Sequence, residues 1–268
     1  GAQVILNGRT PERLAQAAQA LAAQGIAVQT CLFDVTDGPA VRDAVAQIEA
    51  AGPIDILVNN AGMQIRGPLQ DYDERDWNTL MRTNLDSVYH VGQAVARHMI
   101  TRQRGKIINI CSVQSELGRP GIAPYTASKG AVKMLTKGMA IDWGPLGLQV
   151  NGIGPGYFKT ELNQKLVDDP TFSAWLTGRT PSRRWGELAD LGGRALVGDE
   201  AGIAAAVTVG HRAAEHALDL LALRRVQAFG GDEGDADAQL VEADALVFGM
   251  RGDARQHGRV AEQHFRLH

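Results

Sequence analysis

Short apolar segments that alternate with amphipathic helical patterns constrain the fold of this chain more than any other feature. The first such segment is followed by apolar residues at helical spacing, among them Leu14, Ala17 and Leu21. Strands joined through helices run parallel, because a parallel pair needs a long crossover connection. We therefore predict an α/β fold, a doubly wound parallel sheet with helices on both faces. The predicted strands cover residues 3–6, 27–33, 54–58, 106–111 and 148–153.

Length and charge limit the kinds of protein this chain can be. Its 268 residues allow one α/β domain with an ample core. The net charge of −3 gives no reason to expect nucleic acid or an anionic membrane as a partner. We expect neither a signal peptide nor a transmembrane helix, since no apolar run is long enough. Cys31 and Cys111 lie in predicted strands, offer no disulfide framework and favour a cytoplasmic location.

Tyr125 and Lys129 carry the most specific chemistry in the sequence. They lie four residues apart in a helical pattern, so they share one helix face. An ammonium beside a phenol favours the phenolate, which predicts a lowered pKa for Tyr125 and a general acid/base role. Ser112 follows the apolar segment 106–111, and catalytic groups gather at such strand ends in open α/β sheets. A Tyr and a Lys at this spacing also occur by chance on surface helices. The surrounding motifs therefore decide between a catalytic pair and an ordinary surface pair.

Two further features precede Ser112: Asn-Asn-Ala-Gly at residues 59–62, and Asn84. With Ser112 and the Tyr-x-x-x-Lys motif they closely resemble the short-chain dehydrogenase/reductase family, over about residues 1–187. The resemblance implies a Rossmann-like fold and a catalytic set of Asn84, Ser112, Tyr125 and Lys129. In the family the matching Asn bends its helix and holds a water in a proton relay to the Lys. We expect that helix over residues 73–102.

Arg9 predicts which nicotinamide cofactor the chain binds. In a dinucleotide fold, a group at the end of the second strand reads the adenosine ribose. The strand at residues 3–6 corresponds to that second strand, and Arg9 follows it with no acid beside it in the sequence. A guanidinium can hold a 2′-phosphate bidentately, so we predict NADP(H), with NAD(H) as the alternative. A solvated Arg at a helix start is the other interpretation. The resemblance implies further cofactor-binding residues: Asp34, Val35, Asn60, Ala61, Gly62, Tyr125, Lys129, Pro155, Gly156 and Thr160.

The loop that begins at Ser112 indicates a polar substrate. It offers Gln114, Glu116 and Arg119, and either Arg119 or Lys159 could pair with a carboxylate. The same polar groups could instead only cap the loop. The loop resembles family members that act on sugar acids, which implies reversible oxidoreduction of D-gluconate and 5-keto-D-gluconate with hydride transfer at C5. The predicted substrate-binding residues are Ser112, Gln114, Glu116, Arg119 and Tyr125, with residues 162–175 as a lid.

Two other functions remain open from the sequence. A 3-oxoacyl-carrier-protein reductase would have the same fold and the same four catalytic residues. A catalytically defective remnant that only self-associates is the second, because the helices carrying Asn84 and Tyr125 form the main subunit contact of the family. The family is usually tetrameric, so the resemblance implies a homotetramer formed through these helices.

Both ends of the chain depart from the family pattern. The family's first strand and Gly-rich turn should precede Gly1, and that turn presents backbone N–H groups to the cofactor pyrophosphate. We expect an incomplete dehydrogenase domain over residues 1–187, with weak cofactor binding and low or absent activity. Residues 188–268 contain no Lys, Asn, Pro, Ser, Tyr or Trp, and we hypothesise a weakly ordered tail translated in a shifted frame. The tail histidines lack metal-ligand spacing, so we predict no metal site; they include His211, His216, His257 and His264.

Overall fold

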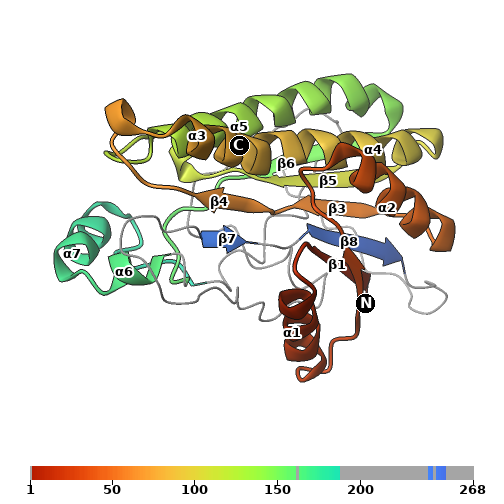
Figure 1. Cartoon of the computed structure of the whole chain (residues 1–268), viewed down its shortest axis with the longest axis horizontal. Helices are drawn as coiled ribbons and strands as arrows, with labels where there is room; N and C mark the ends of the chain where they lie inside the picture. The colour runs from red at the N-terminus through yellow and green to blue at the C-terminus, as the bar shows by residue number, and fades with distance from the viewer. Residues whose placement is uncertain (1, 161–162, 188–240, 244–245, 252–268) are drawn as a thin grey trace, which may run out of the picture.

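A computed structural model describes residues 2–160, 163–187, 241–243 and 246–251 of the chain (Figure 1). The elements before the site loop are β1 (Ala2–Gly8), α1 (Pro11–Ala22), β2 (Val28–Leu32), α2 (Gly38–Ala51), β3 (Ile56–Asn59), β4 (Gly62–Gln64), η1 (Leu69–Asp71), α3 (Glu74–Met81), η2 (Arg82–Asp86), α4 (Ser87–Thr101) and β5 (Gly105–Ile110). The later elements are η3 (Val113–Ser115), α5 (Ala123–Trp143), η4 (Gly144–Leu146), β6 (Leu148–Ile153), α6 (Gln164–Val167), α7 (Pro170–Arg179), β7 (Val241–Ala243) and β8 (Leu246–Arg251).

The main sheet has six strands in the order β2-β1-β8-β3-β5-β6. The pairs β1 with β2, β3 with β5 and β5 with β6 are parallel, and helices connect them. The predicted Rossmann-like, doubly wound α/β fold is therefore confirmed. The strand at residues 148–153 has the bounds that the sequence predicts, and the other four predicted strands differ by a few residues at their ends.

The centre of the sheet differs from the prediction. We expected the family's first strand to be absent from the sheet, and the weakly ordered tail after residue 187 to be irregular. Instead β8 lies between β1 and β3 and pairs antiparallel with both, with Phe248 opposite Ile5 on one side and Leu57 on the other. Two flanking strands with open hydrogen-bonding edges favour such an insertion. Apart from the short strand β7, the rest of the predicted tail, residues 188–240, 244–245 and 252–268, lies outside the described residues.

Two apolar clusters cover the two faces of the sheet. Ile5 belongs to the larger cluster, which packs against α2, α4 and α5, whereas Val4 and Leu6 belong to a smaller cluster with Leu14 and Leu21 of α1. Neighbouring residues of a strand point to opposite faces, so β1 contributes to both clusters. In Figure 1 the helices α3, α4 and α5 lie along one side of the sheet, and α1 lies apart from them.

Buried asparagines hold the strands together near their carboxyl ends. Asn59 Nδ2 of β3 donates to Asn109 Oδ1 of β5 at 2.8 Å, and Asn109 Nδ2 donates to Thr136 Oγ1 of α5 at 3.0 Å. Asn7 Nδ2 of β1 donates to Phe33 O at 2.9 Å. Buried polar groups need such partners, so these bonds fix the register at one edge of the sheet, where the loops of the site begin.

Polar residues that can cap a helix precede both α1 and α2. The Asp37 carboxylate accepts from Ala40 N at 3.1 Å and caps α2. Thr10 is the N-cap residue of α1, but its side chain makes no capping hydrogen bond. Within the described part of the chain, no helix combines the length and the hydropathy needed to cross a bilayer.

Candidate active site

The loops at the carboxyl ends of the parallel strands form one edge of the sheet. Arg9 follows β1, Asp34 follows β2, Asn60 follows β3, Ser112 follows β5 and Pro155 follows β6. Ligands of open α/β sheets bind outside this edge. The loops after β5 and β6 are tied to each other, because Val113 N donates to Pro155 O at 2.8 Å.

Ser112 and Tyr125 lie in direct contact. The Ser112 hydroxyl hydrogen-bonds the Tyr125 side chain and also accepts from Gln114 N at 3.1 Å. Ser115 holds this loop against α5: its Oγ accepts from Ser112 N at 3.2 Å and donates to Lys129 O at 2.8 Å. The short helix η3 therefore fixes the serine hydroxyl beside the phenol.

The sequence prediction of a lowered pKa for Tyr125 is wrong. Burial raises the pKa of Tyr125 above its usual value, and the hydrogen bond from Ser112 lowers it only partly; Arg119 also lowers it. Lys129 is not among the groups that set this pKa. Its ammonium is turned to the backbone, where Nζ donates to Ile110 O at 2.7 Å. Tyr125 is therefore protonated at neutral pH, the form needed to donate a proton.

Lys129 is itself strongly affected by burial. The residue is 5% exposed, on the face of α5 that packs against β5. Desolvation lowers the pKa of Lys129 to about 8, with Cys111 opposing that shift. An ammonium whose pKa lies near neutrality is a group that can exchange protons under physiological conditions.

Asn84 interrupts a long helical stretch. The predicted helix over residues 73–102 forms as α3, the π-helical turn η2 and α4, with Asn84 fully buried in the π-helical turn. Its Oδ1 accepts from Met63 N at 2.7 Å, and its Nδ2 donates to Met63 O at 3.0 Å and to Ser128 Oγ at 3.0 Å. Single π-helical turns frequently mark functional sites. Asn84 thus connects β4 to the helix that carries Tyr125 and Lys129.

Gln114 and Tyr157 form a second pair beside Ser112. Gln114 Nε2 donates to Tyr157 Oη at 3.1 Å, and Gln114 is 6% exposed. Tyr157 packs edge-on against Phe172 of α7 at 5.5 Å between ring centroids, and against Trp185 at 6.1 Å. The segment predicted as a lid, of which residue 162 lies outside the described residues, thus contacts the site through α7.

Arg66 and Tyr157 are site residues that the sequence reasoning missed. Arg66 is half-buried after β4; desolvation and Arg119 lower its pKa, while Tyr157 raises it. The two loops meet where Gly67 N donates to Gly121 O at 3.1 Å. The signal available in the sequence was an arginine shortly after the Asn-Asn-Ala-Gly turn and directly after Ile65.

Two of the predicted polar residues are held in ion pairs. Glu116 pairs with Lys133 of α5, and Lys159 Nζ lies 2.8 Å from Glu187 Oε1. Arg119 Nε, in contrast, is buried without a hydrogen-bond partner in the described part of the chain. Among the predicted carboxylate partners, Arg119 is therefore the better placed to take a new anion.

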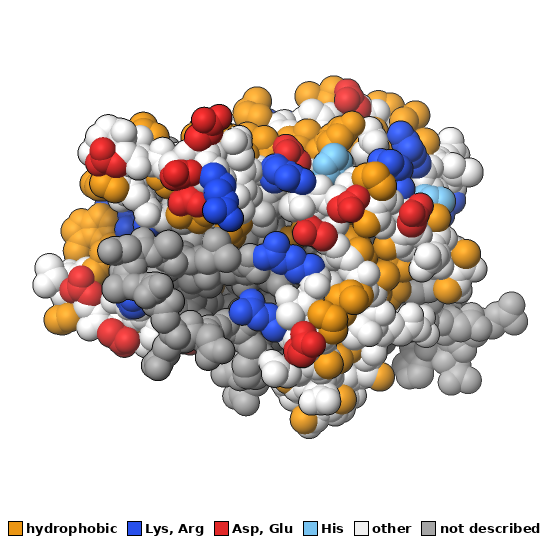
Figure 2. Space-filling model, viewed as in Figure 1, with side chains coloured by type: hydrophobic (Ala, Val, Ile, Leu, Met, Phe, Trp, Pro, Cys, Tyr) orange, Lys and Arg blue, Asp and Glu red, His pale blue; other side chains and the backbone are white. Residues whose placement is uncertain are grey.

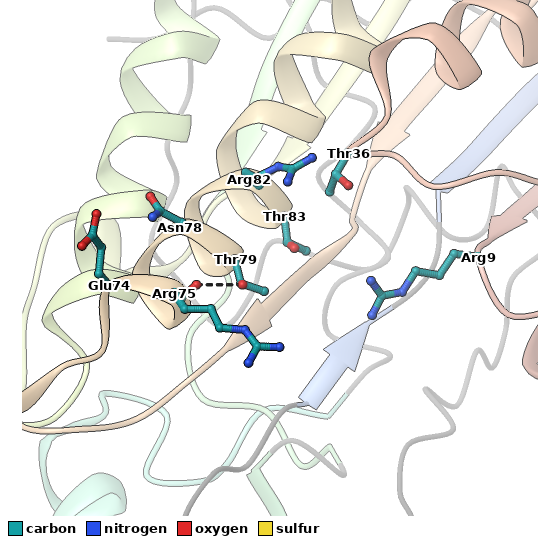
Figure 3. A pocket seen from close by; sticks show the side chains of 8 residues that line it. All are labelled: Arg9, Thr36, Glu74, Arg75, Asn78, Thr79, Arg82 and Thr83. Carbon is teal, nitrogen blue, oxygen red and sulfur yellow. Dashed lines mark hydrogen bonds between the residues drawn. The ribbon is translucent and has the colours of Figure 1, made fainter.

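A basic cavity of about 610 Å³ opens between the end of β1 and the helices α3 and η2 (Figure 3). Figure 3 shows Arg9 facing the helical wall across this space, and Figure 2 shows basic side chains gathered in the middle of the same face. The residues that line it are Arg9, Thr36, Glu74, Arg75, Asn78, Thr79, Arg82 and Thr83. Three guanidiniums and three hydroxyls against one carboxylate suit a phosphorylated ligand.

An acid does lie near Arg9, contrary to the sequence prediction. Asp34 Oδ2 is 4.0 Å from Arg9 Nη1, although 25 positions separate them in the chain. Asp34 Oδ1 accepts from Thr36 N and Thr36 Oγ1, both at 2.8 Å, which holds the carboxylate in place. The sequence could not reveal this neighbour, because parallel pairing of β1 with β2 creates it.

A strand-edge site with a Ser–Tyr hydrogen bond and a buried Lys defines a class of oxidoreductase, and the comparisons with known proteins agree. Residues 1–171 match the short chain dehydrogenase family. The chain belongs to that family, as the sequence resemblance predicted, and is an oxidoreductase of this kind.

Its relatives include enzymes of sugar-acid metabolism. The chain is 60% identical over 197 residues to gluconate 5-dehydrogenase of Gluconobacter oxydans (strain 621H), which covers 73% of this chain and 77% of the relative. It is 51% identical over 197 residues to 5-keto-D-gluconate 5-reductase of Escherichia coli (strain K12), covering 73% and 78%. A crystal structure of a gluconate 5-dehydrogenase from Burkholderia cenocepacia J2315 in complex with NADP and tartrate is 58% identical, with a TM-score of 0.65 over 68% of this chain and 72% of that chain.

Proposed function

We propose that this chain catalyses the reversible NADP(H)-dependent oxidoreduction of D-gluconate and 5-keto-D-gluconate. The observation that carries the proposal is the Ser112–Tyr125 hydrogen bond beside buried Lys129, in a chain 60% identical to a gluconate 5-dehydrogenase. The 5-keto-D-gluconate 5-reductase and the NADP complex among its relatives support the same substrate and cofactor.

The reduction uses Tyr125 as a general acid. Its phenol, kept protonated by burial, donates a proton to the oxygen of the substrate ketone, and the Ser112 hydroxyl hydrogen-bonds that oxygen. The nicotinamide, when bound, supplies the hydride to C5. The ammonium of Lys129, whose pKa burial lowers to about 8, can return a proton to the site after the transfer. Asn84 holds β4 and α5 in the arrangement that this set requires. Oxidation of gluconate runs these steps backwards.

The cofactor's adenosine end would occupy the basic cavity. Arg9 and Thr36 lie on the side where a ribose 2′-phosphate would sit, with Asp34 beside them. A Cβ added at Gly62 would lie 3.4 Å from Asn84 Oδ1 and 3.5 Å from Lys129 Nζ, so glycine leaves room next to the catalytic groups. The further proposed cofactor contacts are Val35, Asn60, Ala61, Pro155, Gly156 and Thr160, all in loops at this edge.

The substrate's carboxylate and hydroxyls would face the loop after Ser112. Arg119, whose Nε has no hydrogen-bond partner among the residues that the structure describes, and Arg66 supply positive charge for a carboxylate. Gln114 supplies a buried polar group for a hydroxyl. A 3-oxoacyl chain would bury apolar surface against these same polar groups without satisfying them, which disfavours the carrier-protein reductase alternative.

We further propose a cytoplasmic homo-oligomer, with residues 1–187 as its dehydrogenase domain. Apolar side chains on α4 and α5 are exposed, including Tyr89, Met134 and Ile141, the last at 74%. Exposed apolar groups on adjacent helices favour a subunit contact. Both cysteines are free thiols, which suits a reducing compartment.

Steady-state kinetics with purified full-length protein tests the function. We expect NADPH oxidation with 5-keto-D-gluconate at a kcat/KM at least about tenfold above that with a 3-oxoacyl thioester, a difference of about 1.4 kcal/mol. A preference for the thioester would assign the chain to the acyl reductases. Binding of NADPH without turnover of either substrate would support the catalytically defective remnant instead.

A further inference from the structure

The side chain of Gln114 is only half satisfied. Its Nε2 donates to Tyr157 Oη at 3.1 Å, while its Oε1 is buried with no hydrogen-bond partner among the described residues. The residue is 6% exposed, so more than nine-tenths of it is removed from solvent. Buried polar atoms of native proteins nearly always have a partner, and an exception points to a missing ligand or water.

Gln114 belongs to the loop that carries Ser112, one of the groups that act on the carbonyl. Gln114 N donates to Ser112 Oγ at 3.1 Å, and that hydroxyl hydrogen-bonds Tyr125. Tyr157 is close enough to Tyr125 to raise its pKa, so the Gln114–Tyr157 pair borders the reacting centre. A substrate group that hydrogen-bonds Gln114 would therefore lie close to the ketone within the substrate.

Tyr157 is well suited to hold the amide in one orientation. Its ring is fixed by edge-on packing against Phe172 and Trp185. Gly186 N donates to Tyr157 O at 2.9 Å, which fixes its backbone as well. A phenol oxygen that accepts from Nε2 directs the opposite end of the carboxamide, Oε1, away from it.

We propose that Gln114 reads a hydroxyl group on the carbon next to the reacting ketone, and that Tyr157 is the positioning residue that turns the Gln114 acceptor toward it. The proposal rests on the proposed function and names the part of a polyhydroxy keto acid that this loop selects. A site built to hydrogen-bond a substrate hydroxyl discriminates strongly against a substrate that lacks it, because the buried acceptor stays unpaired.

A double-mutant cycle with two substrates tests the proposal. The variants are Gln114→Met, which keeps the volume but removes the acceptor, Tyr157→Phe, which keeps the ring, and the double variant. The substrates are 5-keto-D-gluconate and levulinate, a keto acid with no hydroxyl. NADPH binding and circular dichroism show whether each variant is folded and loaded.

We expect Gln114→Met to lower kcat/KM for 5-keto-D-gluconate by at least about tenfold, mainly through KM, and to change that for levulinate by less than about twofold. Tyr157→Phe should lower kcat/KM for 5-keto-D-gluconate about threefold to tenfold in the wild-type background. In the Gln114→Met background it should have no further effect, because a positioning residue acts only through its partner.

The chain supplies a matched control. Gln24 Nε2 donates to Ala20 O at 3.2 Å on the exposed surface just after α1, so Gln24→Met makes the same substitution away from the site. It should leave the preference between the two substrates unchanged. Additive effects of the two site substitutions, or equal losses with both substrates, would overturn the proposal while the proposed function stands. A wild-type protein that reduces levulinate but not 5-keto-D-gluconate would overturn both.

Discussion

Replacing Asn84 with alanine tests the arrangement that connects the π-helical turn to the site. Asn84 is fully buried, and its side chain satisfies both the N–H and the C=O of Met63, which is itself 3% exposed. Asn84→Ala leaves those two backbone groups unpaired in the interior. An unsatisfied buried group costs about 1–3 kcal/mol, so we expect a loss of about 2–6 kcal/mol in the free energy of unfolding. That is a large share of the stability of an ordinary domain, about 5–15 kcal/mol.

The assay is urea unfolding followed by tryptophan fluorescence, with NADPH absent. Asn78→Ala is the control, because Asn78 lies six positions earlier in the same helical stretch but is exposed. Its change should stay within about 0.5 kcal/mol. Equal midpoints for the two variants would refute the reasoning, since a solvated Asn84 would then be indicated.

Three further predictions concern the cofactor site, the active-site lysine and the sheet. Arg9→Asp should weaken NADPH binding at least about tenfold relative to NADH binding, because the carboxylate repels a 2′-phosphate at that place. The fluorescence of the bound nucleotide measures both affinities. Equal losses for the two cofactors would contradict this prediction. Burial lowers the pKa of Lys129 to about 8, so its ammonium is present below that pH and lost above it. The kcat for ketone reduction should therefore fall as pH rises through about 8. A kcat that stays constant from about pH 6 to about pH 10 would contradict a role of the Lys129 ammonium in the reaction. Gly105→Ala should lower the free energy of unfolding by about 1–3 kcal/mol, because the added Cβ would overlap the Met99 side chain. Gly130→Ala is the control, because its Cβ would meet open space and should cause no such loss. Similar unfolding curves for the two variants would contradict this packing.

Local patterns in the sequence predicted most of the sheet and the helices around the site. The strand at residues 148–153 was predicted to the residue, because its alternating pattern is bounded by Gly147 and the Gly154-Pro155-Gly156 turn. The family resemblance implied that Ser112 and Tyr125 share one catalytic set, and the structure brings them into contact. Such features depend on periodicity and turn residues that lie close together in the chain.

Features that depend on contacts between distant segments could not be predicted. β8 is a short apolar run, Leu246–Arg251, but its place in the sheet depends on distant partners: it pairs with β1 and β3 because both offer open edges. The shift in the pKa of Tyr125 has the opposite sign to the prediction, since burial outweighs the charge of a lysine that is turned to Ile110 O. Asp34 near Arg9 and Arg66 near Arg119 likewise arise from the folded arrangement.

The role of Tyr125 as the proton donor is the central claim, and one comparison tests it most directly. NADPH oxidation with 5-keto-D-gluconate is measured for the wild type and for Tyr125→Phe, with NADPH affinity measured in parallel. The account predicts that kcat falls by about 10²–10⁴-fold while NADPH binding is retained, because the phenyl ring keeps its packing against Met63, Ile65 and Leu80 but has no proton to donate. A Tyr125→Phe protein with the turnover of the wild type would contradict it.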